Sequence, residues 1–155
     1  MILSRFYRYT TIIAALLIVM TGIAIAHDGA TGIIKERMDA MKDISTQIKL
    51  MKKMIRGKQP YNASEFKNAA AIVAKHSRDV IQQFPKDSTE KPSRAKPVIW
   101  KDWDEFKELA QKLTDASIEI TALAGKSTKP EALRRTFGKL TKTCKACHKK
   151  FRFKK

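Results

Sequence analysis

Two cysteines and a histidine near the C-terminus have the clearest potential for chemistry in this chain. Cys144, Cys147 and His148 form the pattern C-x-x-C-H, and the sequence has no other cysteine. On a helix, positions i, i+3 and i+4 project from the same side. Two thioether bonds can then hold the edge of a porphyrin while the imidazole reaches the iron, and C-x-x-C-H is the attachment signature of a c-type haem. The motif predicts one covalent haem with His148 as an iron ligand.

Other uses of such a cysteine pair fit the sequence less well. A disulfide that closes so small a loop removes little entropy from the unfolded chain. A thioredoxin-like site needs a βαβ setting, and no such pattern is visible. A structural zinc site needs four ligands, but the other two histidines, His27 and His76, are far from the motif. Haem attachment is therefore the favoured interpretation.

The N-terminus has the pattern of a secretory signal. Arg5 and Arg8 give it a positive start, residues 12–20 form an unbroken apolar run, and Ala24-Ile25-Ala26 matches a cleavage site. The rival interpretation is an uncleaved membrane anchor. A spanning helix needs about 20 apolar residues, and this segment is shorter than that. We expect residues 1–26 to be removed and the protein to be exported to the periplasm, because haem attachment of this type takes place outside the cytoplasm.

The remaining segment, residues 27–155, is a strongly basic chain of the size of one domain. The leader holds two of the 32 basic residues and none of the 15 acidic ones, so the net charge falls from +17 to +15. Such a charge in the cytosol would suggest nucleic acid, but export separates the protein from that partner. Acidic proteins and anionic lipid head groups are the expected attractors.

Two helices are predicted in the first half of this domain. From about Gly32 to Arg56, apolar side chains recur every seven residues, at Ile34, Met41, Ile48 and Ile55. The segment with Gly57 and Pro60 ends that helix. Asn62, followed three residues later by Glu65, is a capping-box pattern, and the apolar face of the second helix continues to Phe84 before Pro85.

A loop over 86–98 separates these helices from two more. Asp102 with Glu105 repeats the capping pattern and begins a helix that reaches Gly125. A fourth helix starts near Pro130 and runs into the cysteine motif. The sequence therefore predicts an all-α protein, an antiparallel four-helix bundle with a covalently bound haem. A coiled-coil dimer is the alternative, but the chain breaks favour an intramolecular bundle, and pairing of finished bundles stays open.

A haem motif at the C-terminal end of a four-helix bundle resembles the class II cytochromes c, the cytochrome c prime family. Class I cytochromes carry the motif near the N-terminus instead. The resemblance covers most of residues 30–155 and extends to segments of every helix. These are Arg37-x-x-x-Met41, Phe84-Pro85, Pro97-x-Ile99-Trp100-x-Asp102-Trp103-x-x-Phe106 and Cys144-x-x-Cys147-His148-x-x-Phe151-Arg152.

The resemblance implies roles for three further residues. Met41 would face the distal side of the haem, Arg37 would lie near a haem propionate, and Arg152 would lie beside the His148 imidazole. A Met41 thioether bonded to the iron would give a six-coordinate haem suited to electron transfer, which is the function that we expect. In the alternative, Met41 only packs over an open iron that binds nitric oxide or carbon monoxide.

The remaining predictions concern partners and polar or aromatic residues. No constellation for hydrolysis or group transfer is visible, so we expect no enzyme. His76 is expected to be structural, and Trp100 and Trp103 to be packing anchors. Lysines crowd the haem-bearing helix, and such a collar would steer an acidic redox partner; they are Lys139, Lys142, Lys145, Lys149, Lys150, Lys154 and Lys155.

Overall fold

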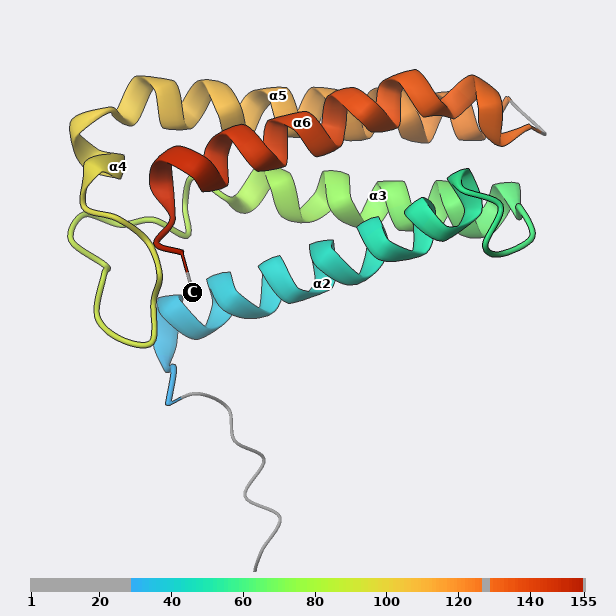
Figure 1. Ribbon diagram of the computed structural model, residues 1–155. Coiled ribbons are helices and arrows are strands. Elements are labelled where there is room, and N and C mark those ends of the chain that lie inside the picture. Colours follow the sequence, from blue (N-terminus) through green and yellow to red (C-terminus); the bar gives the residue numbers. More distant parts are fainter. Residues whose placement is uncertain (1–28, 127–128, 155) are drawn as a thin grey trace, which may run out of the picture.

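The computed structural model describes residues 29–126 and 129–154, in which four long helices form a bundle (Figure 1). The predicted leader and the cleavage point before His27 lie outside these residues. In chain order the elements are α2 (Gly32–Ile55), α3 (Ala63–Asp79), α4 (Val98–Lys101), α5 (Trp103–Ala124), the 3-10 helix η1 (Pro130–Leu133) and α6 (Arg134–Phe151). The predicted all-α four-helix bundle is confirmed.

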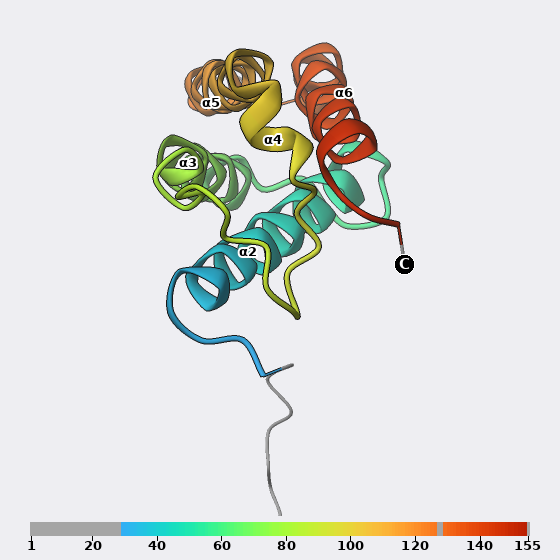
Figure 2. The same cartoon turned by 90° about the vertical axis from the view of Figure 1, so that its left-hand side faces the viewer.

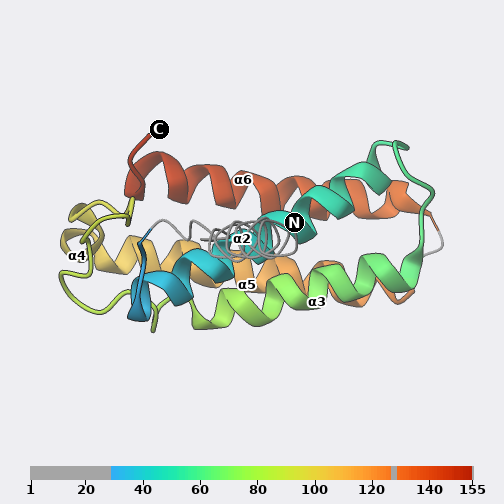
Figure 3. The same ribbon diagram turned by 90° about the horizontal axis from the view of Figure 1, so that it is seen from below.

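The long helices pack in a fixed order around the bundle. Helix α3 packs against both α2 and α5, and α5 packs against α6. The end-on view in Figure 2 shows α5 beside α6, with α3 and α2 below them. In Figure 3, α2 runs obliquely to the other three helices. Within the described ranges, no helix is both long and apolar enough to cross a bilayer.

Two clusters of apolar side chains hold the bundle together. The larger one joins α2, α3, α5 and α6, and its most deeply buried members include Met51, Phe66, Ile120 and Leu140. The smaller one lies at the α4 end and is rich in aromatic rings, with Phe84, Phe106 and Phe151 buried in it. Each helix contributes the stripe that its sequence periodicity predicts, so burial of these stripes is the main force that assembles the bundle.

Two predicted helix boundaries are confirmed in atomic detail. The Asn62 side chain accepts a hydrogen bond from the Glu65 backbone N–H at 3.0 Å, as an N-cap residue does. Helix α2 ends before Gly57, whose φ of +67° lies in the left-handed region. The Lys58 N–H then donates to the carbonyl of Lys53 at 2.9 Å, which is the long bond of a Schellman motif.

The second helix is shorter than the sequence predicts. Helix α3 ends at Asp79, and the chain continues in turns, one of which has the Phe84 N–H donating to the Ile81 carbonyl at 3.2 Å. The Gln83 carbonyl accepts a hydrogen bond from the Arg37 guanidinium at 3.2 Å. Phe84 is still buried, so its apolar character predicted burial correctly but not the helix that would provide it.

The predicted start of the third long helix at Asp102 is confirmed, but the predicted side-chain cap is not formed. Asp102 precedes α5, but its side chain makes no capping hydrogen bond. Its carboxylate instead pairs with the Lys150 ammonium at 2.7 Å. Because Lys150 lies on α6, this ion pair links two helices, and an interaction of that kind is invisible to a local sequence pattern.

Two isoleucines on α5 provide a matched test of the core. Ile120 is fully buried, whereas Ile118 is 46% exposed. We expect Ile120→Ala to lower the free energy of unfolding by about 3 kcal/mol, because it leaves a cavity, and Ile118→Ala to change it by less than about 0.5 kcal/mol. Urea denaturation followed by circular dichroism measures both. Equal losses would contradict the assigned packing.

Candidate haem site

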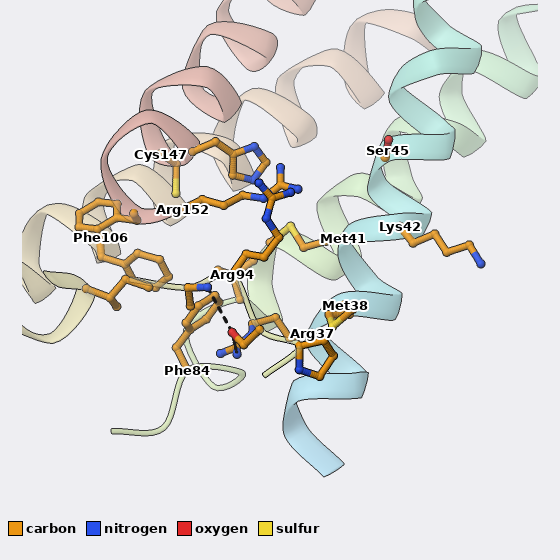
Figure 4. A pocket seen from close by; sticks show the side chains of 17 residues that line it. Arg37, Met38, Met41, Lys42, Ser45, Phe84, Arg94, Phe106, Cys147 and Arg152 are labelled. Carbon is orange, nitrogen blue, oxygen red and sulfur yellow. Dashed lines mark hydrogen bonds between the residues drawn. The ribbon is translucent and has the colours of Figure 1, made fainter. Parts of the chain in front are cut away.

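A pocket opens between α2 and the C-terminal end of α6, and the loop between α3 and α4 closes one side of it. Its volume is about 670 Å³, which is within the range of cofactor pockets. Figure 4 shows its side chains converging from these elements. The wall includes Arg37, Met38, Met41, Ser93, Arg94, Phe84, Phe106, Cys147, His148, Phe151 and Arg152.

The cysteine motif lies on the last turns of α6, as predicted. Cys147 and His148 line the pocket. Cys144 lies one turn earlier, is partly buried and packs against the larger core cluster. Both cysteines are free, so both sulfur atoms remain chemically able to form thioether bonds.

Partial loss of hydration shifts the pKa values of the Cys147 thiol and the His148 imidazole, although part of the His148 side chain is exposed. It raises the pKa of the Cys147 thiol to about 11, with a further contribution from Cys144. A redox-active C-x-x-C pair depends on a lowered thiol pKa, so the environment disfavours that use. Loss of hydration in the pocket, followed by the charges of Arg152 and Arg94, lowers the pKa of His148. The imidazole is therefore neutral near pH 7, which is the form that binds a metal.

Met41 lies on the α2 wall of the pocket. It is partly buried and packs against both core clusters. Figure 4 shows its side chain extending from α2 toward the side chains of α6. Met38 also lines the pocket, whereas Met51 and Met54 are buried in the larger core. The structure thus separates two pocket methionines from two core methionines, but bonding of Met41 to iron stays a prediction.

Arg37 is buried, and its guanidinium makes four hydrogen bonds to the loop that follows α3. Its guanidinium donates to the carbonyls of Gln83 and Ser88 and to the hydroxyls of Ser88 and Ser93, at 2.8 to 3.2 Å. It also lies 4.2 Å from the centre of the Phe84 ring. Burial lowers its pKa. The predicted contact between Arg37 and a haem propionate stays a prediction.

Arg152 and an arginine that sequence reasoning missed lie together at the pocket. Arg152 follows α6, and Arg94 is in the loop before α4; both line the pocket. Their chain segments meet in an antiparallel bridge between Ala95 and Arg152. Nothing in the local sequence around Arg94 identifies it, because its position depends on the path of an irregular loop.

His76, Trp100 and Trp103 are expected to be structural. His76 lies outside the haem site, and the two tryptophans pack near the aromatic residues of its wall. His76 on α3 lies 2.7 Å from the Asp43 carboxylate on α2, and it does not line the pocket. Trp103 stacks on Phe106 with ring centres 5.3 Å apart. The Trp100 indole donates to the Phe84 carbonyl at 3.3 Å. These contacts agree with the predicted packing roles.

The pocket residues fit a covalent haem. Two free thiols lie one helical turn apart, a neutral imidazole follows them, and aromatic and thioether side chains form much of the wall. Phe106 and Phe151 contact each other edge to face below the motif. Among the described residues, no group of three histidine, cysteine or acidic side chains could hold a metal ion without a cofactor. The structure thus defines a four-helix haem protein of the c type.

Comparisons with known proteins agree with this class. The family model described as Cytochrome C' matches residues 32–152. The chain is 31% identical to a cytochrome c-556 of Agrobacterium tumefaciens (strain B2A), over 80% of this chain and 99% of that protein. It resembles the solved cytochrome c prime of Shewanella frigidimarina with a TM-score of 0.74 and 26% identity, over 79% and 94% of the two chains.

A further similar structure contains a bound gas. It is a ferrous variant of cytochrome c prime from Alcaligenes xylosoxidans with bound NO, and it is 28% identical with a TM-score of 0.71, over 79% and 94% of the chains. Because the family model covers most of the chain, the protein belongs to the cytochrome c prime family. It accordingly carries one covalent haem c.

Removal of both thiols tests the attachment site. We expect protein secreted from a host that matures cytochromes to have the mass of the polypeptide plus one haem. Cys144→Ala combined with Cys147→Ala is expected to give the bare polypeptide mass, because no sulfur remains to form a thioether. Mass spectrometry under denaturing conditions measures this. His76→Ala is the control and should keep the haem; an unchanged haem content in the double variant would contradict the site.

Proposed function

We propose that this protein binds a small neutral gas, nitric oxide or carbon monoxide, on the α2 side of its haem. The observation that carries the proposal is that, among the described residues that line the pocket, His148 is the only one with an imidazole. When bound, the haem would supply an iron that can take up a small neutral ligand. The chain offers only weaker ligands on that side, and the best placed is the Met41 thioether.

In this proposal the pocket residues hold the haem in place and keep hydrated ions away from the iron. His148 would hold the iron from α6, and loss of hydration, followed by the charges of Arg152 and Arg94, lowers its pKa and so favours its neutral state. Met41 and Met38 cover the opposite side with flexible apolar side chains. Such a wall admits a small neutral molecule more readily than a hydrated anion, because burial of an unpaired charge is costly.

The comparisons support gas binding better than the electron transfer expected from the sequence. Several relatives are described as cytochrome c prime, and several solved structures of one of them hold NO. We therefore prefer the five-coordinate interpretation, in which Met41 packs over the iron without a bond to it.

Electron transfer with His148 and Met41 as axial ligands is the second candidate. It is favoured by the position of Met41, whose thioether lies on the wall that faces the motif-bearing helix. A thioether ligand raises the reduction potential of a haem. In either case the proposed role is that of a binding or carrier protein and not of an enzyme.

We also propose the location and the partners that the sequence suggests. Residues 1–26 act as a cleaved signal peptide, and the domain over 27–155 works in the periplasm, as is typical of cytochromes c. Its partners are acidic redox proteins. Two bundles pair as a homodimer, which the mass of the protein in solution tests. On α6, Lys142, Lys145 and Lys149 are exposed.

Carbon monoxide uptake tests the proposed function. We expect the ferrous wild-type protein to bind CO, and Met41→Ala to increase the association rate about tenfold, or about 1.4 kcal/mol of barrier, because it clears the distal wall. Stopped-flow absorbance measures the rate. Met54→Leu changes a core methionine of the same helix and should leave the rate unchanged.

The same measurement separates the two candidates. A wild-type protein that has a low-spin spectrum and takes up no CO, while Met41→Ala becomes high-spin and gains CO binding, would overturn the gas-binding proposal in favour of Met41 ligation.

Ionic strength tests the proposed partner class. We expect the rate of electron exchange with an acidic flavodoxin to fall about tenfold or more from low to physiological salt, because steering is screened. Lys142→Glu combined with Lys149→Glu should abolish most of that dependence. Lys52→Glu combined with Lys53→Glu, near the far end of α2, is the matched control. A rate that is independent of salt in the wild-type protein would contradict steering.

A further inference from the structure

The loop over 80–97, between α3 and α4, is held in place by Arg37. Four hydrogen bonds from this one guanidinium reach three residues of the loop, Gln83, Ser88 and Ser93. Ser88 and Ser93 continue the network, because the Ser88 hydroxyl donates to the Pro85 carbonyl at 2.8 Å and the Ser93 hydroxyl accepts from the Ala95 N–H at 3.2 Å. A guanidinium has five N–H donors, so Arg37 is largely used within the protein.

The loop that Arg37 holds delivers Arg94 to the pocket. The segment around Arg94 is tied to the end of α6 by two backbone hydrogen bonds, from Lys96 N–H to the Phe151 carbonyl at 3.0 Å and from Phe153 N–H to the Arg94 carbonyl at 2.8 Å. The Arg94 guanidinium also donates to the Phe153 carbonyl. These bonds place Arg94 beside Arg152 at the pocket wall.

Arg94 and Arg152 form a pair of like charges to which no described residue supplies a carboxylate. Figure 4 shows both side chains reaching toward the same region of the pocket. Burial and the charge of Arg94 lower the pKa of Arg152, as expected for two nearby cations. In the part of the chain that the structure describes, neither arginine forms an ion pair with a carboxylate. An anion at this point would relieve the repulsion.

We propose that Arg94 and Arg152 together bind one propionate carboxylate of the haem, and that Arg37 is a positioning residue that holds the loop carrying Arg94. Guanidinium and carboxylate geometries match, and two such donors form strong charge-assisted hydrogen bonds. The assignment moves the anion-binding role from Arg37, where the family resemblance placed it, to a loop residue. It rests on the covalent haem and is independent of whether the protein binds gas or transfers electrons.

Resonance Raman spectroscopy of the holoprotein tests the contact directly, because the propionate bending band reports hydrogen bonds to the carboxylates. We expect Arg94→Gln to shift this band and Arg94→Lys to restore it in part. We also expect Arg94→Gln to favour the ferric form about tenfold, or about 59 mV for a one-electron couple, because a carboxylate loses its counter-ion. Lys96→Gln removes a charge from the same loop outside the pocket and should leave the band unchanged.

Arg37→Lys tests the positioning role. The charge is kept, but one ammonium cannot make the four bonds to the loop, so we expect faster amide hydrogen exchange over 86–97 and a band shift toward that of Arg94→Gln. Amides in the core of α5 provide the internal control. Unchanged exchange would overturn the positioning role.

The outcomes also separate this proposal from the haem assignment. A Raman band that is identical in the wild-type protein, Arg94→Gln and Lys96→Gln would overturn the carboxylate contact, even with the haem attached and gas binding intact. Absence of haem from the wild-type protein, measured by mass, would instead mean failure of the haem assignment itself.

Discussion

The structure depends on one constraint, which is that α2 and the end of α6 stand far enough apart to hold a large planar group. Four amphipathic helices without a cofactor would gain free energy by closing such a space, because apolar side chains would leave water. Here α2 runs obliquely, and Met41 and Phe106 form walls of a pocket of about 670 Å³. The haem therefore completes a core that the chain alone leaves open at one end.

Two devices keep that end of the bundle in place. The aromatic cluster of Phe84, Phe106 and Phe151 supplies stiff contacts below the motif, and the Arg37 network fixes the loop above it. The ion pair between Lys150 and Asp102 adds a link between α6 and the start of α5. Since these contacts come from distant parts of the sequence, the geometry of the site depends on tertiary packing more than on any one helix.

Sequence reasoning succeeded where the controlling interactions are local. Helical periodicity gave the stripes of α2 and α5, the Asn62 cap follows from a four-residue pattern, and the spacing of Cys147 and His148 placed both at the pocket. It failed for the side-chain cap of Asp102, whose carboxylate pairs with Lys150 instead, and for the end of α3. At Asp102 a partner from another helix outweighed the local preference.

Arg37 and Arg94 show the same difference between what local sequence predicts and what tertiary packing decides. A motif pointed to Arg37 as a pocket residue, and Arg37 is there, but its hydrogen bonds are set by serines that lie 51 and 56 positions away in the sequence. Arg94 belongs to no motif, and only the course of an irregular loop brings it beside Arg152. Side-chain partners of this kind cannot be read from spacing, because loops have no repeating geometry.

The central claim is that an iron lies in the pocket between α2 and α6 and is bound by His148. Anomalous scattering from crystals of the holoprotein, recorded on both sides of the iron absorption edge, locates the metal directly. The account predicts one strong peak per chain within bonding distance of the His148 ring and on the side of α6 that faces Met41. A peak at His76 and Asp43, or no iron peak in the pocket, would contradict it.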